Sequence, residues 1–169
     1  AGDPDAQTTV VQLRNRINQK ELADIQKGDA AYESGDYATA LREFTPLAKQ
    51  DNAIAQYALG WMYYAGEGVA QDYKTAAKWL TLSAEQGFSL AQNNLGIWYI
   101  NGEGVPQNNK IALKWFKLAA QQGNEHAQKA VEELQKKIDE ELKAERIAKG
   151  EERKSKLETA RGKWGLKFG

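Results

Sequence analysis

The sequence predicts an all-α fold of stacked helix pairs, and three observations predict it. Residues 53–88 and 89–124 are two copies of one 36-residue unit, so that Leu59 superimposes on Leu95 and Trp79 on Trp115. A period of this length is typical of supersecondary units that bury their apolar faces only by stacking on one another. Glycines follow each expected helix, and nothing in the repeats alternates apolar and polar residues with period two, so we expect no sheet.

The length of the chain fits one domain, and its composition gives no net charge. Lys plus Arg and Asp plus Glu each total 23 in 169 residues. Residues 149–169 carry a net charge of +4, which is most often the mark of a solvated end. The chain contains no cysteine, which excludes disulfides and thiolate metal sites. It also lacks a run of 18 apolar residues, so we expect no transmembrane segment.

The N-terminal part divides into two expected segments. Residues 1–27 form a polar segment and a capping helix, with residues 1–9 loose and an imperfect apolar stripe over 10–27. Residues 28–52 form a shorter, divergent repeat whose first helix ends near Ser34-Gly35. Its second helix lies around 37–47, and Pro46 should kink or end it because proline lacks the backbone donor.

The two full repeats give the clearest helices. In the first we expect helices over 52–65 and 73–86, and in the second over 90–101 and 109–122. Glycines close the first helix of each pair, because they accept backbone angles that other residues resist. Asp72 and Asn108 are the expected N-caps of the second helices. Trp79 and Trp115 are expected to be buried equivalents.

The C-terminal part begins with a partial repeat at 125–135 and continues as a charged helical extension over 136–161. We expect Gly150 to interrupt this helix. Residues 162–169 form a tail in which Trp164, Leu166 and Phe168 occupy alternate positions, as in an extended segment. These three residues are predicted to dock within the molecule or onto a second copy. A disordered terminus is an equally weighted alternative.

Two motifs carry a resemblance to a known family. The pattern A-Q-x-x-L-G-x-x-Y-x-x-G-E-G-V starts at Ala55 and again at Ala91, and Lys-Trp at 78–79 and 114–115 is followed by Gln-Gly at 86–87 and 122–123. These residues resemble the Sel-one-like repeat, a relative of the tetratricopeptide repeat, over a little more than half the chain. The resemblance implies a right-handed α-solenoid with an extended C-terminal helix. It also implies an adaptor role and, in many bacterial members, export.

The resemblance implies a concave groove lined by the first helix of each repeat. The positions carried over as partner-binding are Asp29, Tyr32, Tyr57, Trp61, Tyr64, Asn93, Ile97, Ile100, Asn101 and Lys129, with Glu133 beside them. The residues themselves support part of this set, because Tyr57, Trp61 and Tyr64 lie on a different helix face from Leu59 and Tyr63. One apolar face must therefore meet something other than the neighbouring helix. Packing on a terminal helix is the alternative; partners commonly use such aromatic anchors, which favours the groove.

The chain offers no constellation for catalysis. His126 is the only histidine, so no metal set can be assembled without relying on carboxylates. The Gly-Glu-Gly turns at 66–68 and 102–104 follow no strand and lack the context of a phosphate-binding loop. Glu67 and Glu103 are expected to be solvated. We therefore expect no enzyme activity, no cofactor and no metal.

The sequence thus favours a non-enzymatic adaptor that binds a segment of another protein in its groove. One alternative is a structural protein that self-associates through its C-terminal helix and tail, and another is a helper subunit at a membrane or cell wall. We expect no nucleic acid among its partners, since the repeats are not basic. The chain begins with Ala1 rather than Met, which suits a removed signal peptide or an expression scar. A periplasmic or secreted bacterial protein is expected, with the cytoplasm left open.

Overall fold

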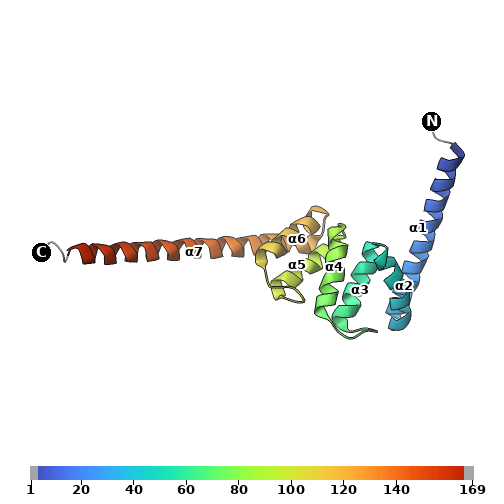
Figure 1. The fold of residues 1–169 in the computed structure, drawn as a ribbon, viewed down its shortest axis with the longest axis horizontal. Helices are drawn as coiled ribbons and strands as arrows, with labels where there is room; N and C mark the ends of the chain where they lie inside the picture. The colour runs from blue at the N-terminus through green and yellow to red at the C-terminus, as the bar shows by residue number, and fades with distance from the viewer. Residues whose placement is uncertain (1–3, 166–169) are drawn as a thin grey trace.

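Seven α-helices and no strand make up the described part of the chain in a computed structural model (Figure 1). It describes the backbone of residues 4–165 and the side chains of residues 18–161. The helices are α1 (Pro4–Glu33), α2 (Tyr37–Lys49), α3 (Ala53–Ala65), α4 (Tyr73–Glu85), α5 (Ser89–Asn101), α6 (Asn109–Gln121) and α7 (Glu125–Gly165). Each helix packs chiefly on the helices before and after it in the chain. This is the expected all-α repeat solenoid with a long C-terminal helix.

The helices of the full repeats begin and end within one residue of the expected positions, and their caps explain why. The side chains of Asp72 and Asn108 each accept two backbone N–H groups of the first turn they precede. Gly66 and Gly102 end α3 and α5 with φ values of 75° and 76°, in the left-handed region. The capping residues therefore fix the frame of each repeat.

Three apolar clusters form the core and follow one another in chain order. The first joins α1, α2 and α3, the second joins α4 and α5, and the third joins α6 and α7. Phe44, Leu80 and Phe116 are each about 1% exposed and lie in successive clusters. Such a core, built from neighbours only, is the energetic pattern of a solenoid.

A buried glutamine paired with an exposed one recurs between the helices. Gln56 Nε2 donates to the carbonyl oxygen of Ala48 at 3.0 Å, and its Oε1 accepts from Gln86 Nε2 at 2.6 Å. The second repeat copies this arrangement, in which Gln92 donates to the Ala84 carbonyl and accepts from Gln122. Each pair satisfies a carbonyl near the C-terminal end of the preceding helix, so it fixes how one repeat sits on the next.

Trp79 and Trp115 were expected to be buried, and this expectation is wrong, because both are only half-buried. One residue turns an α-helix by 100°, which places Trp79 at the margin of the α4 face that buries Ala76 and Leu80. It still packs against the first cluster, as Trp115 packs against the second. Among the tryptophans whose side chains are described, Trp98 is the buried one, with 3% of its surface exposed.

Both terminal helices are longer than expected. Helix α1 starts at Pro4, in the segment expected to be loose, and it runs through Gly28. A Cβ at Gly28 would lie 2.5 Å from the Phe44 ring, so this glycine permits close packing of α1 on α2 and does not end a helix. Helix α2 contains Pro46 and ends one turn after it, close to where the proline was expected to stop it.

Helix α7 runs through Gly150 without the expected interruption, and it continues into the tail. Ion pairs at i,i+4 flank the glycine: Glu145 with Lys149 at 2.5 Å and Glu152 with Lys156 at 2.6 Å. Residues 162–165 are helical, so the extended tail expected there is wrong. Leu166, Phe168 and the side chain of Trp164 lie outside the described residues, so docking of the tail stays a prediction.

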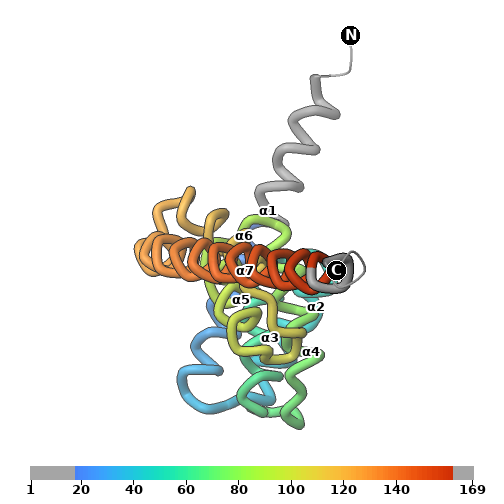
Figure 2. Tube along the Cα trace, turned by 90° about the vertical axis from the view of Figure 1, so that its left-hand side faces the viewer, coloured from blue at the N-terminus to red at the C-terminus, as the bar shows by residue number. Residues whose placement is uncertain are grey.

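Helix α7 leaves the repeats as a single rod (Figures 1 and 2). Its first turns carry Leu134 and Ile138 into the third cluster, whereas residues 139–161 are exposed throughout. None of the described helices, α7 included, has a stretch long and apolar enough to cross a bilayer.

Candidate functional site

A pocket of about 250 Å³ lies between α1, α2, α3 and the turn that precedes α5. Its lining residues are Asp29, Tyr32, Phe44, Ile54, Tyr57, Ala58, Trp61 and Phe88. Four of them, from α1 and α3, belong to the predicted partner-binding set: Asp29, Tyr32, Tyr57 and Trp61. The structure therefore brings together residues that lie up to 32 positions apart in the sequence.

A row of aromatic rings runs along α3 from this pocket. The ring of Phe88 lies edge-on to Tyr57 at 5.2 Å between centroids, and Tyr57 lies edge-on to Trp61 at 6.3 Å. Trp61 is followed by Tyr64 at 5.3 Å, which stacks on Trp98 at 5.0 Å. Edge-on and stacked rings attract one another beyond their area burial, so the row is a fixed surface. We call Phe88, Tyr57, Trp61 and Tyr64 the aromatic row.

Two faces of α3 explain the row. One face is fully buried and carries small and aliphatic residues such as Ala55, Leu59 and Gly60. Tyr57, Trp61 and Tyr64 lie on the other face and are half-buried. Their ring neighbours come from α3, α4, α5 and Phe88. In this structure the rings thus pack on the repeats themselves and keep part of their surface in solvent.

Hydrogen bonds hold two of the pocket's rings in place. The Tyr57 hydroxyl accepts from Asn94 Nδ2 at 3.1 Å. The Tyr32 hydroxyl donates to Glu67 Oε2 at 2.7 Å, and Tyr37 donates to the other oxygen of Glu67 at 3.2 Å. Burial first, and then the Glu67 carboxylate, raise the pKa of Tyr32 to about 12. The expectation that Glu67 is solvated is wrong, since it is half-buried and accepts from two phenols.

A second tyrosine pair lies one repeat later. Tyr64 and Tyr73 lie 5.3 Å apart between ring centroids, as Tyr32 and Tyr37 lie 5.6 Å apart. Burial and then Glu103, the equivalent of Glu67, raise the pKa of Tyr64. Glu67 is therefore bonded to both tyrosines of its pair, whereas Glu103 acts on Tyr64.

The other predicted residues lie outside the pocket. Tyr64 belongs to the aromatic row, and Ile100 packs against the third cluster. Asn93 donates to Asn94 Oδ1 at 3.3 Å, and Asn101 donates to Glu103 Oε1 at 3.0 Å. Three more are exposed, on α5 and α7: Ile97, Lys129 and Glu133. The structure thus concentrates four predicted residues in the pocket and distributes the rest over α3, α5 and α7.

Sequence reasoning missed four lining residues: Phe44, Ile54, Ala58 and Phe88. Ile54 is 42% exposed at the start of α3, and its equivalent in α5, Leu90, is 51% exposed. An apolar residue that recurs at an exposed helix position was a usable signal. Phe88 gave none, because it follows the Gln-Gly turn where a loop residue is expected.

The chemistry of the site is aromatic contact beside one carboxylate. Within the residues whose side chains are described, no group of three His, Cys, Asp or Glu residues is placed to hold a metal ion. His126 is exposed on the first turn of α7. Asp29 is the only charged residue in the pocket lining, and it is exposed. Partial desolvation, and then the nearby Glu33, raise its pKa.

Comparison with known proteins identifies the repeats. Residues 53–88 and 89–124 match the Sel1 repeat, so the chain contains two Sel1 repeats. A Sel1 repeat protein from Oxalobacter formigenes is similar in structure with a TM-score of 0.60 and 34% identity over 63% of this chain. A protective antigen of uropathogenic Escherichia coli strains that displays an SLR fold is similar with a TM-score of 0.61 and 36% identity over 69% of this chain.

The match covers only part of each neighbour: 44% of the Oxalobacter chain and 26% of the Escherichia coli chain. No curated protein sequence is similar enough to be matched. The comparisons confirm the resemblance and the solenoid fold. Sel1 repeats are generally protein–protein interaction modules and are typically non-enzymatic.

Proposed function

We propose that this Sel1 repeat chain is a non-enzymatic interaction module that binds a segment of a partner protein along the aromatic row and in the adjoining pocket. The observation that carries the proposal is the row itself, four rings in edge-on contact that keep part of their surface in solvent. Trp and Tyr are the side chains that most often dominate binding energy at interfaces. Because their neighbours already fix these rings, little side-chain entropy is lost on binding.

The size of the pocket favours a polypeptide over a metabolite. Pockets for small-molecule ligands usually measure about 300–1,000 Å³ and enclose most of the ligand. This one measures about 250 Å³, which suits a single side chain. The exposed residues Leu90 and Ile97 of α5 extend the apolar surface past the row. A partner segment would place one side chain in the pocket and run along the rings towards α5.

Capture from a lysate of the source organism tests the proposal when it is done with matched variants. Trp61→Ala/Tyr64→Ala removes the middle of the row, whereas Leu82→Ala/Leu118→Ala removes two exposed leucines from equivalent positions of α4 and α6. We expect the wild type and the leucine variant to retain the same proteins and the aromatic variant to lose them. Proteins retained equally by all three would contradict the proposal. Circular dichroism of each variant controls for folding.

A second candidate, self-association through α7, rests on a separate observation. Residues 139–161 of the helix are all exposed, and they include the apolar side chains of Leu142, Ile147 and Leu157. A single polar helix of this kind gains stability when its apolar residues meet a partner helix. Light scattering on the full chain and on a chain ending at residue 141 tests this. A concentration-dependent dimer that persists after truncation would exclude α7 as the contact.

A further inference from the structure

The pocket beside the aromatic row carries a negative charge that forms no ion pair with any cation whose side chain is described. Asp29 belongs to its lining, and Glu33 lies one turn further along the same face of α1. Like charges at i,i+4 on a helix repel each other. Among the residues with described side chains, the ion pairs join Glu43, Glu145 and Glu152 to bases, and none includes Asp29 or Glu33.

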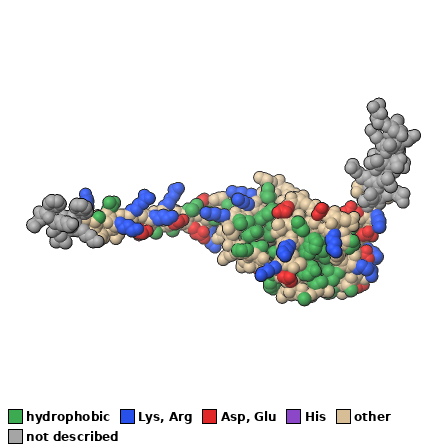
Figure 3. Space-filling model, in the orientation of Figure 1, with side chains coloured by type: hydrophobic (Ala, Val, Ile, Leu, Met, Phe, Trp, Pro, Cys, Tyr) green, Lys and Arg blue, Asp and Glu red, His purple; other side chains and the backbone are tan. Residues whose placement is uncertain are grey.

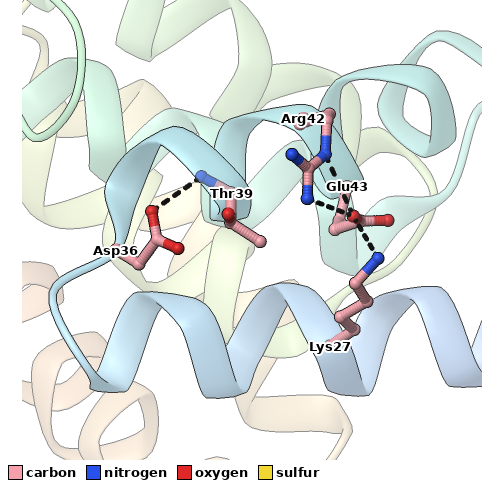
Figure 4. Close-up of polar contacts among 5 residues, drawn as sticks. All are labelled: Lys27, Asp36, Thr39, Arg42 and Glu43. Carbon is pink, nitrogen blue, oxygen red and sulfur yellow. Dashed lines mark hydrogen bonds and ion pairs between the residues drawn. The ribbon is translucent and has the colours of Figure 1, made fainter.

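On the other side of α1 a carboxylate is compensated by bases, in contrast to Asp29. Lys27 precedes Asp29 by two residues and therefore lies about 200° around the helix. Its ammonium pairs with Glu43 Oε1 at 2.7 Å, and Arg42 approaches the same oxygen at 3.3 Å (Figure 4). These bases lower the pKa of Glu43, with the Lys27 hydrogen bond as the main cause. Both cations are thus engaged away from the pocket, whose lining contains neither lysine nor arginine.

The other walls of the pocket suit a cation as well. Three of its rings, those of Tyr32, Tyr57 and Trp61, present π systems of the kinds that attract ammonium and guanidinium groups. The Tyr32 hydroxyl donates to Glu67, which makes its ring richer in electrons. Tyr57 and Phe88 are held edge-on at 5.2 Å, so this wall is already formed. Apolar side chains of Ile54 and Ala58 complete a surface for a methylene stem.

We propose that the pocket accepts the side chain of a lysine or arginine of the partner segment, with its stem against the rings of Tyr57 and Trp61 and its charge beside Asp29. The inference rests on the proposed function and narrows it to a partner segment that carries a basic residue. Such side chains combine an apolar stem with a charged end, which matches aromatic walls beside a carboxylate. Hydrophobic side chains alone would leave Asp29 to lose water without gaining a partner.

Selection from a library of random heptapeptides, displayed against the full chain, tests the inference. The chain is used as wild type and as three variants: Asp29→Asn/Glu33→Gln, Trp61→Ala, and Glu140→Gln/Glu141→Gln. The last is a matched control that removes two exposed carboxylates from α7. We expect Lys or Arg at one position of the peptides selected by wild type and control. The Asp29 variant should lose that preference.

The affinity of the chain for one selected peptide then measures the contribution of the peptide's positive charge. Replacing its arginine by citrulline removes the charge and keeps the shape. We expect a loss of at least fivefold on the wild type and less than twofold on Asp29→Asn/Glu33→Gln. Peptides that need Trp61 but show no preference for Lys or Arg would overturn this inference and leave the proposed function standing. Peptides that ignore Trp61, or a selection that yields none, would overturn both.

Discussion

Two glycines at equivalent positions of α3 and α5 should respond differently to the same substitution. Gly60 and Gly96 are 36 residues apart and both are buried where two helices cross. An added Cβ at Gly60 would meet its neighbours, atoms of Ala76 and Leu80, at 3.4 Å, which is ordinary contact. At Gly96 it would lie 2.8 Å from the ring of Phe116, which occupies the position of Leu80 one repeat later.

The magnitudes follow from two opposing terms. Replacing glycine by alanine inside a helix gains about 1 kcal/mol in helix propensity. Overpacking a filled core costs about 1–3 kcal/mol, and Phe116 is buried in the third cluster with 1% of its surface exposed. Gly60→Ala should therefore leave stability unchanged or raise it by up to ~1 kcal/mol. Gly96→Ala should be less stable than Gly60→Ala by about 1–3 kcal/mol.

Urea denaturation followed by circular dichroism measures this difference, and a third variant tests its cause. Phe116→Leu copies the residue that packs on Gly60 in the first repeat. Combined with Gly96→Ala it should cost less than the sum of the single changes by at least ~0.5 kcal/mol, because the two residues touch. If Gly96→Ala proved as stable as Gly60→Ala, or if the two changes were additive, the packing described for α5 and α6 would be wrong.

Three further predictions concern other parts of the chain. Gln92→Leu should destabilise by about 1–3 kcal/mol in chemical denaturation, because it removes two hydrogen bonds of a buried side chain, one to the Ala84 carbonyl and one from Gln122. Gln128→Leu, at an exposed site, should change stability by less than ~0.5 kcal/mol. In an alkaline titration followed by phenolate absorbance, the wild type should show one tyrosine that ionises near pH 12, and Tyr32→Phe should lack this step. Glu67→Gln should lower the pKa of Tyr32 towards 10. Because this pKa is raised in the folded state, its stabilisation is complete below pH 10 and is lost as the pH rises towards 12. Gly150→Pro should lower helical ellipticity while leaving the unfolding midpoint of the repeats unchanged, since α7 packs on nothing there; a shifted midpoint would show the contrary.

Much of the fold was predictable because repetition states the same local signals twice. Asp72 and Asn108 cap their helices, and Gly66 and Gly102 end theirs, so these four boundaries follow from the caps. The errors lie where a residue has two physical uses. Gly150 tolerates a helix as well as it breaks one, and its flanking ion pairs favour the helix. Only the structure decides such a position.

The site was predictable in part for a related reason. The spacing of Tyr57 and Trp61 indicates a second apolar face of α3, and the sequence alone was enough to predict that face. Glu67 could not, because its role depends on phenols 30 and 35 residues away. Phe88 reaches the pocket only because the turn before α5 lies beside α3. Contacts between repeats depend on the superhelical geometry, which no local pattern contains.

The most direct test of the account is the affinity of a captured partner for the aromatic row. Isothermal titration calorimetry would compare the wild type, Trp61→Ala and the outer-surface control Leu82→Ala, each checked for an unchanged circular dichroism spectrum. Trp61→Ala is predicted to weaken binding at least tenfold, or ~1.4 kcal/mol, while Leu82→Ala leaves it unchanged. Equal affinity of Trp61→Ala and wild type, or a loss confined to Leu82→Ala, would contradict the account.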